Sequence, residues 1–298
     1  MVSPSATSEA AALAIAPPRR RSSAFLRSLR RNPLGIAGLS IIVLVALVAI
    51  FAPLISPYGP TEQVARRLLE PSPEYILGTD EFGRDILSRV IYGSRISLYV
   101  GLVSVSLALI VGGTLGMAAG YFGGTTDTLL MRLVDIIFAI PSLVLAIVIA
   151  GLLGPSLTNA MIAIGIVYAP IYARLVRGEV LAVRNQLYVE SARATGVGHL
   201  GMIARHILPN ITAPLIIQTT LMLSTAILAE AALSFLGLGT QPPEPSWGTM
   251  LGSGRRYMEL TPWVAVAPGI AIVITVLGFN LLGDGLRDAL DPRLRGSE

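Results

Sequence analysis

The side chains that could do chemistry in this chain are few. The only histidines are His199 and His206, too few and too close together for most zinc sites. There is no cysteine, which excludes disulfides, thiol catalysis and cysteine-type metal sites. An enzyme working inside apolar helices would need a paired constellation, such as two aspartates or a serine with a histidine, and no such pair stands out. We therefore expect no catalytic residue, no metal site and no cofactor in this chain.

Three ionisable residues lie within or beside long apolar stretches. Glu230 stands in Ala229-Glu230-Ala231, and an ionisable group at membrane depth is a functional candidate by default. The alternative for Glu230, which we favour, is a structural hydrogen bond to a neighbouring helix or to the outer loop. Arg132 and Asp135 stand three positions apart in the sequence, at helical spacing, and we expect intrachain pairing rather than contact with a substrate.

The composition indicates what kind of molecule must position these residues. Hydrophobic residues make up 53% of the 298 residues and charged residues only 13%, whereas a soluble domain usually carries about 25% charged residues. The mean hydropathy is +0.70. All 22 basic residues are arginines, lying mainly beside apolar stretches, which argues for membrane orientation and against nucleic-acid binding. The sequence therefore predicts a membrane protein.

Apolar stretches of about 20 residues are long enough to cross a bilayer, and the chain contains about six of them. Backbone polar groups must pair internally in lipid, so each span should be a helix and the fold all-α. The third and fourth spans are joined by a tight turn at Gly154-Pro155-Ser156. The predicted spans are Leu34–Ile55, Ile96–Tyr121, Leu129–Leu153, Leu157–Val176, Ile211–Leu236 and Trp263–Leu282.

Arginine counts in the loops predict the orientation. Arginines gather in the N-terminal tail, in the loop between the fourth and fifth spans and in the C-terminal tail, which places these three segments in the cytoplasm. The first loop also carries arginines, but it is long and acidic and counts for less. The expected parts are a tail over 1–31, a first helix with a long outer loop over 32–95, a core over 96–290 that includes a cytoplasmic loop at 185–209, and a tail over 291–298.

Within the outer loop, Thr79 or Asp80 could cap a helix running through Phe82, Ile86 and Val90. Such a helix would either lie along the membrane surface or meet another protein, and the sequence does not separate these alternatives.

The loop between the fourth and fifth spans has the most informative pattern. Val189–Ala194 predicts a short helix, which Gly196 and Gly198 interrupt because glycine tolerates positive φ. His199–Leu208 predicts a second helix, whose apolar face would consist of Leu200, Ile203 and Ile207. This helix–turn–helix offers a small apolar face, ringed by arginines, to a partner protein.

This loop resembles the EAA loop of ABC-importer permeases, whose pattern is Glu-Ala-Ala, three residues, Gly, nine residues, Ile-x-Leu-Pro. Ser191 replaces the first alanine, and His206 stands where isoleucine is usual. The positions that match at the family spacing are Glu190, Ala192, Gly196, Leu208 and Pro209. The resemblance implies that this loop, with Ser191 and His206 included, docks in a groove on an ATPase subunit and couples the closure of the ATPases to movement of the helices.

Further segments resemble one branch of that family, the C-type subunit of dipeptide, oligopeptide and nickel permeases. The resemblance runs from about residue 30 to 295 and implies a five-helix permease core preceded by an N-terminal helix. The segments are Asn32-Pro33-Leu34, Leu77 to Asp85, Tyr121 to Gly124, Leu233 to Gly239, Pro245 to Gly248 and Asn280 to Asp288.

The resemblance implies a division of labour in the inner membrane of a bacterium. Two related permease subunits would form the pathway, two cytoplasmic ATPases would bind ATP and Mg and hydrolyse ATP, and an external binding protein would deliver a peptide. This chain has no lysine and so no Walker phosphate loop, which agrees with an ATPase on another chain. One alternative is a permease for nickel or another small solute. A channel or secondary transporter that works without ATP would leave the Glu190–Pro209 pattern unexplained.

Overall fold

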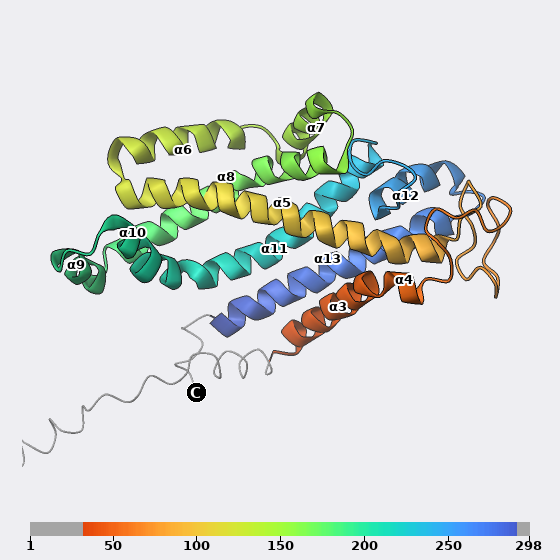
Figure 1. Ribbon diagram of the computed structural model, residues 1–298, viewed down its shortest axis with the longest axis horizontal. Coiled ribbons are helices and arrows are strands. Elements are labelled where there is room, and N and C mark those ends of the chain that lie inside the picture. Colours follow the sequence, from red (N-terminus) through yellow and green to blue (C-terminus); the bar gives the residue numbers. More distant parts are fainter. Residues whose placement is uncertain (1–31, 291–298) are drawn as a thin grey trace, which may run out of the picture.

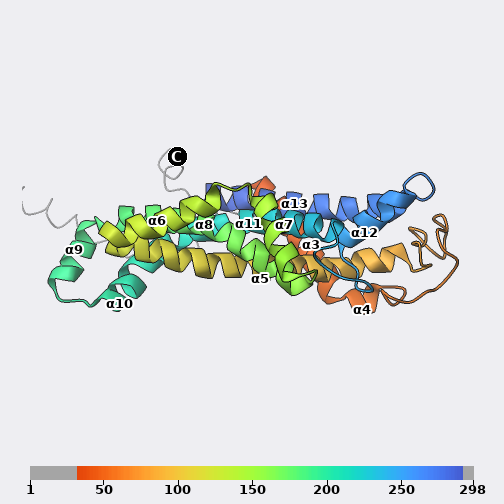
Figure 2. The ribbon, with the colours of Figure 1, turned by 90° about the horizontal axis from the view of Figure 1, so that it is seen from above.

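The protein folds into an elongated bundle of helices (Figures 1 and 2). The computed structural model describes residues 32–290, so the predicted tails at 1–31 and 291–298 lie outside the described residues. No strand occurs between residues 32 and 290, where a single isolated bridge joins Thr79 and Asp85. Five long helices run side by side along the bundle: α3 (Pro33–Ile50), α5 (Ile86–Phe122), α8 (Leu157–Arg184), α11 (Leu208–Phe235) and α13 (Trp263–Leu290).

These five helices are each long and apolar enough to cross a membrane. The span that contains α11 is counted from His199 to Phe235, because the residues before α11 continue the same helix. A sixth span is broken: α6 (Gly124–Phe138) and α7 (Ser142–Leu153) meet at an angle of 88°. Pro141 lies at this break, where its ring and its missing N–H interrupt the helix. The prediction of about six helical spans is confirmed if this pair is counted as one span, but Leu129–Leu153 is not a single straight helix.

Helix α5 begins well before the predicted start of the second span at Ile96. Asp85 caps it by accepting a hydrogen bond from the backbone N–H of Ser88 at 2.7 Å. The predicted cap at Thr79 or Asp80 is therefore wrong: the expected helix through Ile86 is the first part of α5 and no separate surface helix.

Asp80 organises the loop between α4 (Ala52–Ile55) and α5 instead. Its carboxylate accepts from the backbone N–H groups of Phe82 and Arg84, at 2.8 and 3.0 Å, and from Nε of Arg84 at 2.6 Å. The Arg89 guanidinium, in the buried first turn of α5, lies 3.4 Å from the same carboxylate and donates to the carbonyl of Pro60 at 2.7 Å. These buried charges are paired and hydrogen-bonded, which offsets the cost of removing them from water.

The contact between α5 and α8 depends on small residues. Gly112, Gly116 and Gly120 lie along the face of α5 that meets α8. A Cβ atom at Gly112 or Gly116 would collide with the backbone carbonyl of Ala169 or Ala173 on α8. Because membrane helices associate through close packing, these glycines let the two backbones touch.

A short helix that the sequence analysis did not predict, α12 (Trp247–Gly254), precedes the 3₁₀ turn η2 (Arg255–Tyr257). Ser246 caps α12 in a capping box with Thr249. The buried Trp247 ring donates from Nε1 to the carbonyl of Val90 on α5 at 2.9 Å. The helix α12 and the loop before α5 lie together at one end of the bundle (Figure 1).

The opposite end of the bundle is formed by α9 (Leu187–Ala194) and α10 (His199–Met202) (Figure 1). A π-helical turn, η1 (Ile203–Ile207), connects α10 directly to α11. We call residues 185–209, which contain these elements, the coupling loop.

Candidate coupling site

The coupling loop has the helix–turn–helix form that the glycines predict. Helix α9 ends at Ala194, and Gly196 adopts a left-handed φ of +83°. The backbone N–H of Val197 then bonds the carbonyl of Ala192 at 3.2 Å, which closes the end of the helix. A Cβ at Gly196 would meet nothing within 4 Å. Glycine is therefore required there by the backbone conformation and not by a lack of space for a side chain. Gly198 has φ −68° and places no such demand.

One face of the coupling loop is buried against three long helices. Val189, Met202 and Ile207 are each at most 1% exposed. They form one apolar cluster with Tyr121 at the end of α5 and with residues of α8 and α11. Because all three helices contact the loop, a displacement of the loop acts on all of them.

The predicted apolar face of Leu200, Ile203 and Ile207 is wrong in one member. Leu200 is 84% exposed, and Met202 is buried in its place. The reason is the π-helical turn, in which the N–H of Leu208 bonds the carbonyl of Ile203. A turn closed by bonds between residues five apart brings Met202 and Ile207 onto one face.

The opposite face of the coupling loop is exposed and apolar. Leu187 and Leu200 are 81% and 84% exposed, and Tyr188 is also exposed. Exposed leucines on two short helices are typical of a surface that a partner protein covers.

The residues of the EAA-like pattern divide between the two faces. Glu190 is exposed in the first turn of α9, where the helix dipole favours a negative charge, and it forms no ion pair within residues 32–290. Ser191 is exposed and its hydroxyl bonds the carbonyl of Leu187 at 2.9 Å, while Ala192 is half-buried against the cluster.

At the other end of the pattern, His206 lies half-buried on the π-helical turn, and its carbonyl accepts from the Asn210 side chain at 2.7 Å. Leu208 begins α11 and is 43% exposed. Pro209 is the second residue of α11 and follows the π-helical turn directly, so its missing N–H leaves one gap in the backbone hydrogen bonds between η1 and α11.

Two contacts to the end of α5 escaped the sequence analysis. The hydroxyl of Tyr121 lies 2.8 Å from Nδ1 of His199, and the two rings meet edge to face with centroids 5.6 Å apart. The Arg184 guanidinium at the end of α8 donates to the carbonyls of Gly120 and Tyr121, at 2.8 and 3.3 Å. The terminal carbonyls of a helix carry partial negative charge, so a guanidinium is favourable there.

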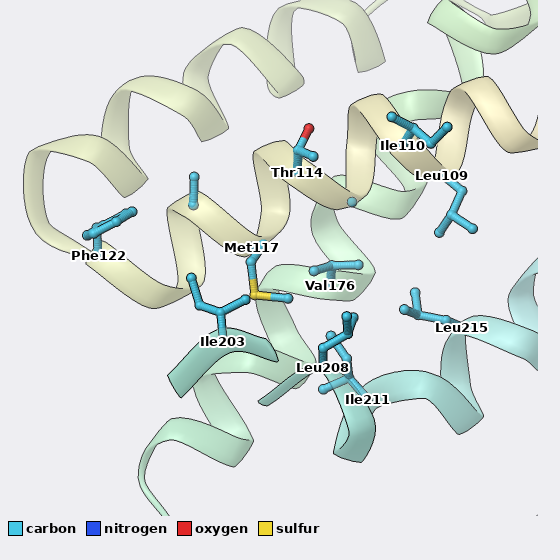
Figure 3. A pocket seen from close by; sticks show the side chains of 12 residues that line it. Leu109, Ile110, Thr114, Met117, Phe122, Val176, Ile203, Leu208, Ile211 and Leu215 are labelled. Atoms are coloured by element: carbon cyan, nitrogen blue, oxygen red, sulfur yellow. The ribbon is translucent and has the colours of Figure 1, made fainter. Parts of the chain in front are cut away.

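An apolar groove of about 520 Å³ opens beside the coupling loop (Figure 3). Side chains of α5 form one wall, those of η1 and α11 form the other, and Val176 of α8 lies between them. Among the described residues that line the groove, Thr114 alone has a polar side chain. The labelled lining residues are Leu109, Ile110, Thr114, Met117, Phe122, Val176, Ile203, Leu208, Ile211 and Leu215.

Helix α6 is joined to α8 by ion pairs. Asp135 pairs with Arg174 at 2.7 Å, so its partner is on another helix, and within residues 32–290 no ion pair joins it to Arg132. Asp127 receives two hydrogen bonds from the Arg177 guanidinium, the longer at 2.7 Å. The expected pairing of Asp135 within the chain is thus present with a different partner, while Arg132 is exposed.

Glu230 is completely buried near the end of α11. Its carboxylate accepts from the Ser234 hydroxyl at 2.7 Å, and that hydroxyl in turn accepts from the backbone N–H of Thr240 at 3.0 Å. The other carboxylate oxygen of Glu230, Oε2, and the Thr240 hydroxyl are buried without hydrogen-bond partners. The geometry therefore connects Glu230 to the loop that leads into α12, in keeping with the architectural role that we favour for it.

Comparison with known proteins places this arrangement in a family. The profile of binding-protein-dependent transport system inner membrane components matches residues 112–296, and the N-terminal membrane domain of oligopeptide transport permease C matches residues 22–71. The dipeptide transport system permease protein DppC of Alkalihalophilus pseudofirmus is 51% identical over 271 residues, covering 90% of this chain and 89% of that protein. DppC of Haemophilus influenzae is 48% identical, covering 89% and 92%.

The glutathione transport system permease protein GsiD of Pectobacterium atrosepticum is 44% identical over 90% of both chains. Among solved structures, a chain of the inward-facing MetNI methionine ABC transporter has a TM-score of 0.56 at 20% identity, covering 69% of this chain and 98% of that one. This likeness shows a shared fold. Together, the profile match, the identities and the coverage show that this chain belongs to the family of binding-protein-dependent transport system inner membrane components, as an ABC-importer permease of the C type.

Proposed function

We propose that this chain forms half of the translocation pathway of an ATP-driven importer of di- or oligopeptides. A second, homologous permease subunit supplies the other half. The peptide substrate is supported by relatives described as dipeptide permeases, which are 48% and 51% identical to the chain. Because substrate choice in this family depends largely on the binding protein, we assign the peptide substrate to the whole importer and not to this chain alone.

The observation that carries the proposal is the two-sided character of the coupling loop. Val189, Met202 and Ile207 anchor the loop to α5, α8 and α11, while Leu187 and Leu200 remain exposed. An exposed surface joined rigidly to several spanning helices suits a loop that receives mechanical work from a partner. We place a cytoplasmic ATPase, one of two in the assembly, on this surface.

ATP and Mg bind to those ATPase subunits, and an extracytoplasmic binding protein delivers the peptide at the opposite end of the bundle. Closure of the ATPases around ATP moves the two coupling loops and shifts the bundle between inward-open and outward-open states. The coupling loop and both chain termini then lie in the cytoplasm of the bacterium.

The orientation is tested with single cysteines, since the chain has none of its own. In cells that express the permease subunits without the ATPases, Leu200→Cys should react with a membrane-impermeant maleimide only when the inner face is opened to the reagent. Glu259→Cys, exposed at the opposite end, serves as the matched control and should react in intact cells. Reaction of the cysteine at 200 from outside would overturn the assignment of the coupling loop.

Function is tested by reconstituting the chain with its permease partner, ATPases and binding protein in proteoliposomes. A labelled dipeptide should accumulate only with ATP and Mg, and nickel should not accumulate under the same conditions. Accumulation of dipeptide by this chain alone, without the ATPases, would contradict the proposal.

A further inference from the structure

A cavity of about 460 Å³ lies at the end of the bundle opposite the coupling loop. Three segments enclose it: the tip of the loop before α5, the end of α11 with the residues that follow it, and α12 with η2. Its volume falls within the range of about 300–1,000 Å³ that is usual for small-molecule sites. Under the proposed function, this end of the bundle faces the side from which the peptide arrives.

The cavity contains one acidic and one basic side chain, Glu81 and Arg256. Oxygen Oε2 of Glu81 is buried without a hydrogen-bond partner. Arg256 is exposed and takes part in no ion pair within residues 32–290, and the two charges do not pair with each other. The neighbouring Asp80 is saturated by Arg84 and by backbone N–H groups, whereas the Thr240 hydroxyl, which also lines the cavity, is buried without a partner, as Oε2 of Glu81 is. A buried carboxylate oxygen without a partner is costly unless a ligand completes its bonding.

The remaining lining is mixed in character. Phe82, Phe235 and Leu236 are 55%, 40% and 53% exposed, and Tyr257 also contributes a ring. Polar groups come from Gln241, Thr249 and Ser253, among others. A ligand that fits this cavity has a positive group, a negative group and an apolar body of small size.

We propose that this cavity is a binding site for the free termini of a short zwitterionic peptide. The peptide's ammonium group bonds Glu81, its carboxylate bonds the Arg256 guanidinium, and its side chains contact Phe82, Phe235 and Leu236. A guanidinium binds a carboxylate through two parallel hydrogen bonds, which gives this end of the site its orientation. This inference rests on the proposed peptide import. It identifies the part of the chain that binds the peptide first.

The test uses the two permease subunits with both ATPases in nanodiscs, without the binding protein. The probe is a dipeptide whose second side chain carries a photoreactive diazirine. After irradiation, mass spectrometry locates the labelled residues. We expect adducts within 234–242 and 249–257, which excess unlabelled dipeptide removes. Glu81→Gln and Arg256→Gln should each reduce labelling about tenfold at low probe concentration, the loss expected for one charge-assisted hydrogen bond.

Arg255→Gln and Glu259→Gln are the matched controls, because both residues are exposed near the cavity and do not line it. They should label as the unchanged chain does. The N-acetylated probe and the C-terminally amidated probe should label the unchanged chain weakly. Equal labelling by free and blocked probes, or adducts in the cavity that persist in both the Glu81→Gln and the Arg256→Gln variants, would overturn the site.

Failure of the site differs from failure of the proposed function. If the reconstituted importer accumulates dipeptide with ATP, but the Glu81→Gln and Arg256→Gln variants are labelled as strongly as the unchanged chain, only the site is wrong. If no dipeptide accumulates in the presence of all partners, the peptide import itself is wrong.

Discussion

The Tyr121 hydroxyl and Nδ1 of His199 lie 2.8 Å apart, although the two residues are 78 positions apart in the sequence. Tyr121 is near the end of α5, and His199 is the first residue of α10. The bond therefore joins the coupling loop directly to a membrane-spanning helix, beside the apolar cluster that holds Val189 and Met202.

Tyr121→Phe keeps the ring contact with His199 and removes the hydroxyl. Because a typical hydrogen bond contributes about 0.5–1.5 kcal/mol, we expect a moderate fall in the peptide transported per ATP hydrolysed. His199→Phe should cause a similar fall, and the double variant should lose little more than either single variant. Additive losses in this cycle would show that the two side chains act separately. Tyr99→Phe, which is also on α5 but is exposed and lies away from the coupling loop, is the control and should leave the ratio unchanged within experimental error.

Gly196→Val should uncouple the transporter. A β-branched residue in the left-handed region costs about 1–2 kcal/mol or more, so the turn must change its conformation and α9 must move relative to α10. We expect ATP hydrolysis to continue while peptide uptake falls. Gly198→Ala is the matched control, since its φ of −68° suits alanine and a Cβ there meets nothing within 4 Å. Unchanged uptake and coupling in a normally assembled Gly196→Val complex would refute the role of the turn.

Gly116→Ala should destabilise the bundle, because a Cβ there would overlap the Ala173 carbonyl on α8. Separating the two backbones should cost about 1–3 kcal/mol, measured as a lower Tm of the purified complex. Gly113→Ala, on the same helix, would bring its Cβ only to 3.9 Å from Leu109 and should keep the original Tm. Equal Tm values for the two variants would mean that α5 and α8 can separate without penalty.

Glu230→Leu should lower the stability of the complex by about 1–3 kcal/mol, because the Ser234 hydroxyl loses its acceptor in a buried site. Glu230→Gln retains a carbonyl oxygen for that bond and should lose much less, as followed by Tm and by peptide uptake. A Glu230→Gln complex with normal Tm and no uptake would point instead to a functional need for the carboxylate.

The helical spans and the turn at 154–156 were accessible from sequence because they depend on local hydropathy and on glycine and proline. The form of the coupling loop was accessible for the same reason, through Gly196. The early start of α5 was not, because Arg89 and its neighbours are polar in sequence, and only contacts with Pro60 and Asp80 in the fold bury them.

Features that depend on contacts between distant segments were missed. The π-helical turn at 203–207 shifts the buried face from Leu200 to Met202, and the apolar spacing in the sequence gives no sign of it. The bond between Tyr121 and His199, and the pairing of Asp135 with Arg174, join different helices. The Ser246 capping box before Trp247 was a local signal for α12 that could have been recognised.

Helix α5 contains 37 residues without interruption, which corresponds to a rod of about 56 Å. The hydrocarbon layer is about 30 Å thick, so both tips of the rod stand beyond it, one beside the coupling loop and one beside the loop anchored by Asp80. A tilt of about 5° about one tip would carry the other about 5 Å sideways, which is simple lever geometry applied to that length. A rigid helix of this length can transmit a nucleotide-driven movement on one side of the membrane to the other side, where it opens the pathway. No series of intermediate side-chain rearrangements is needed.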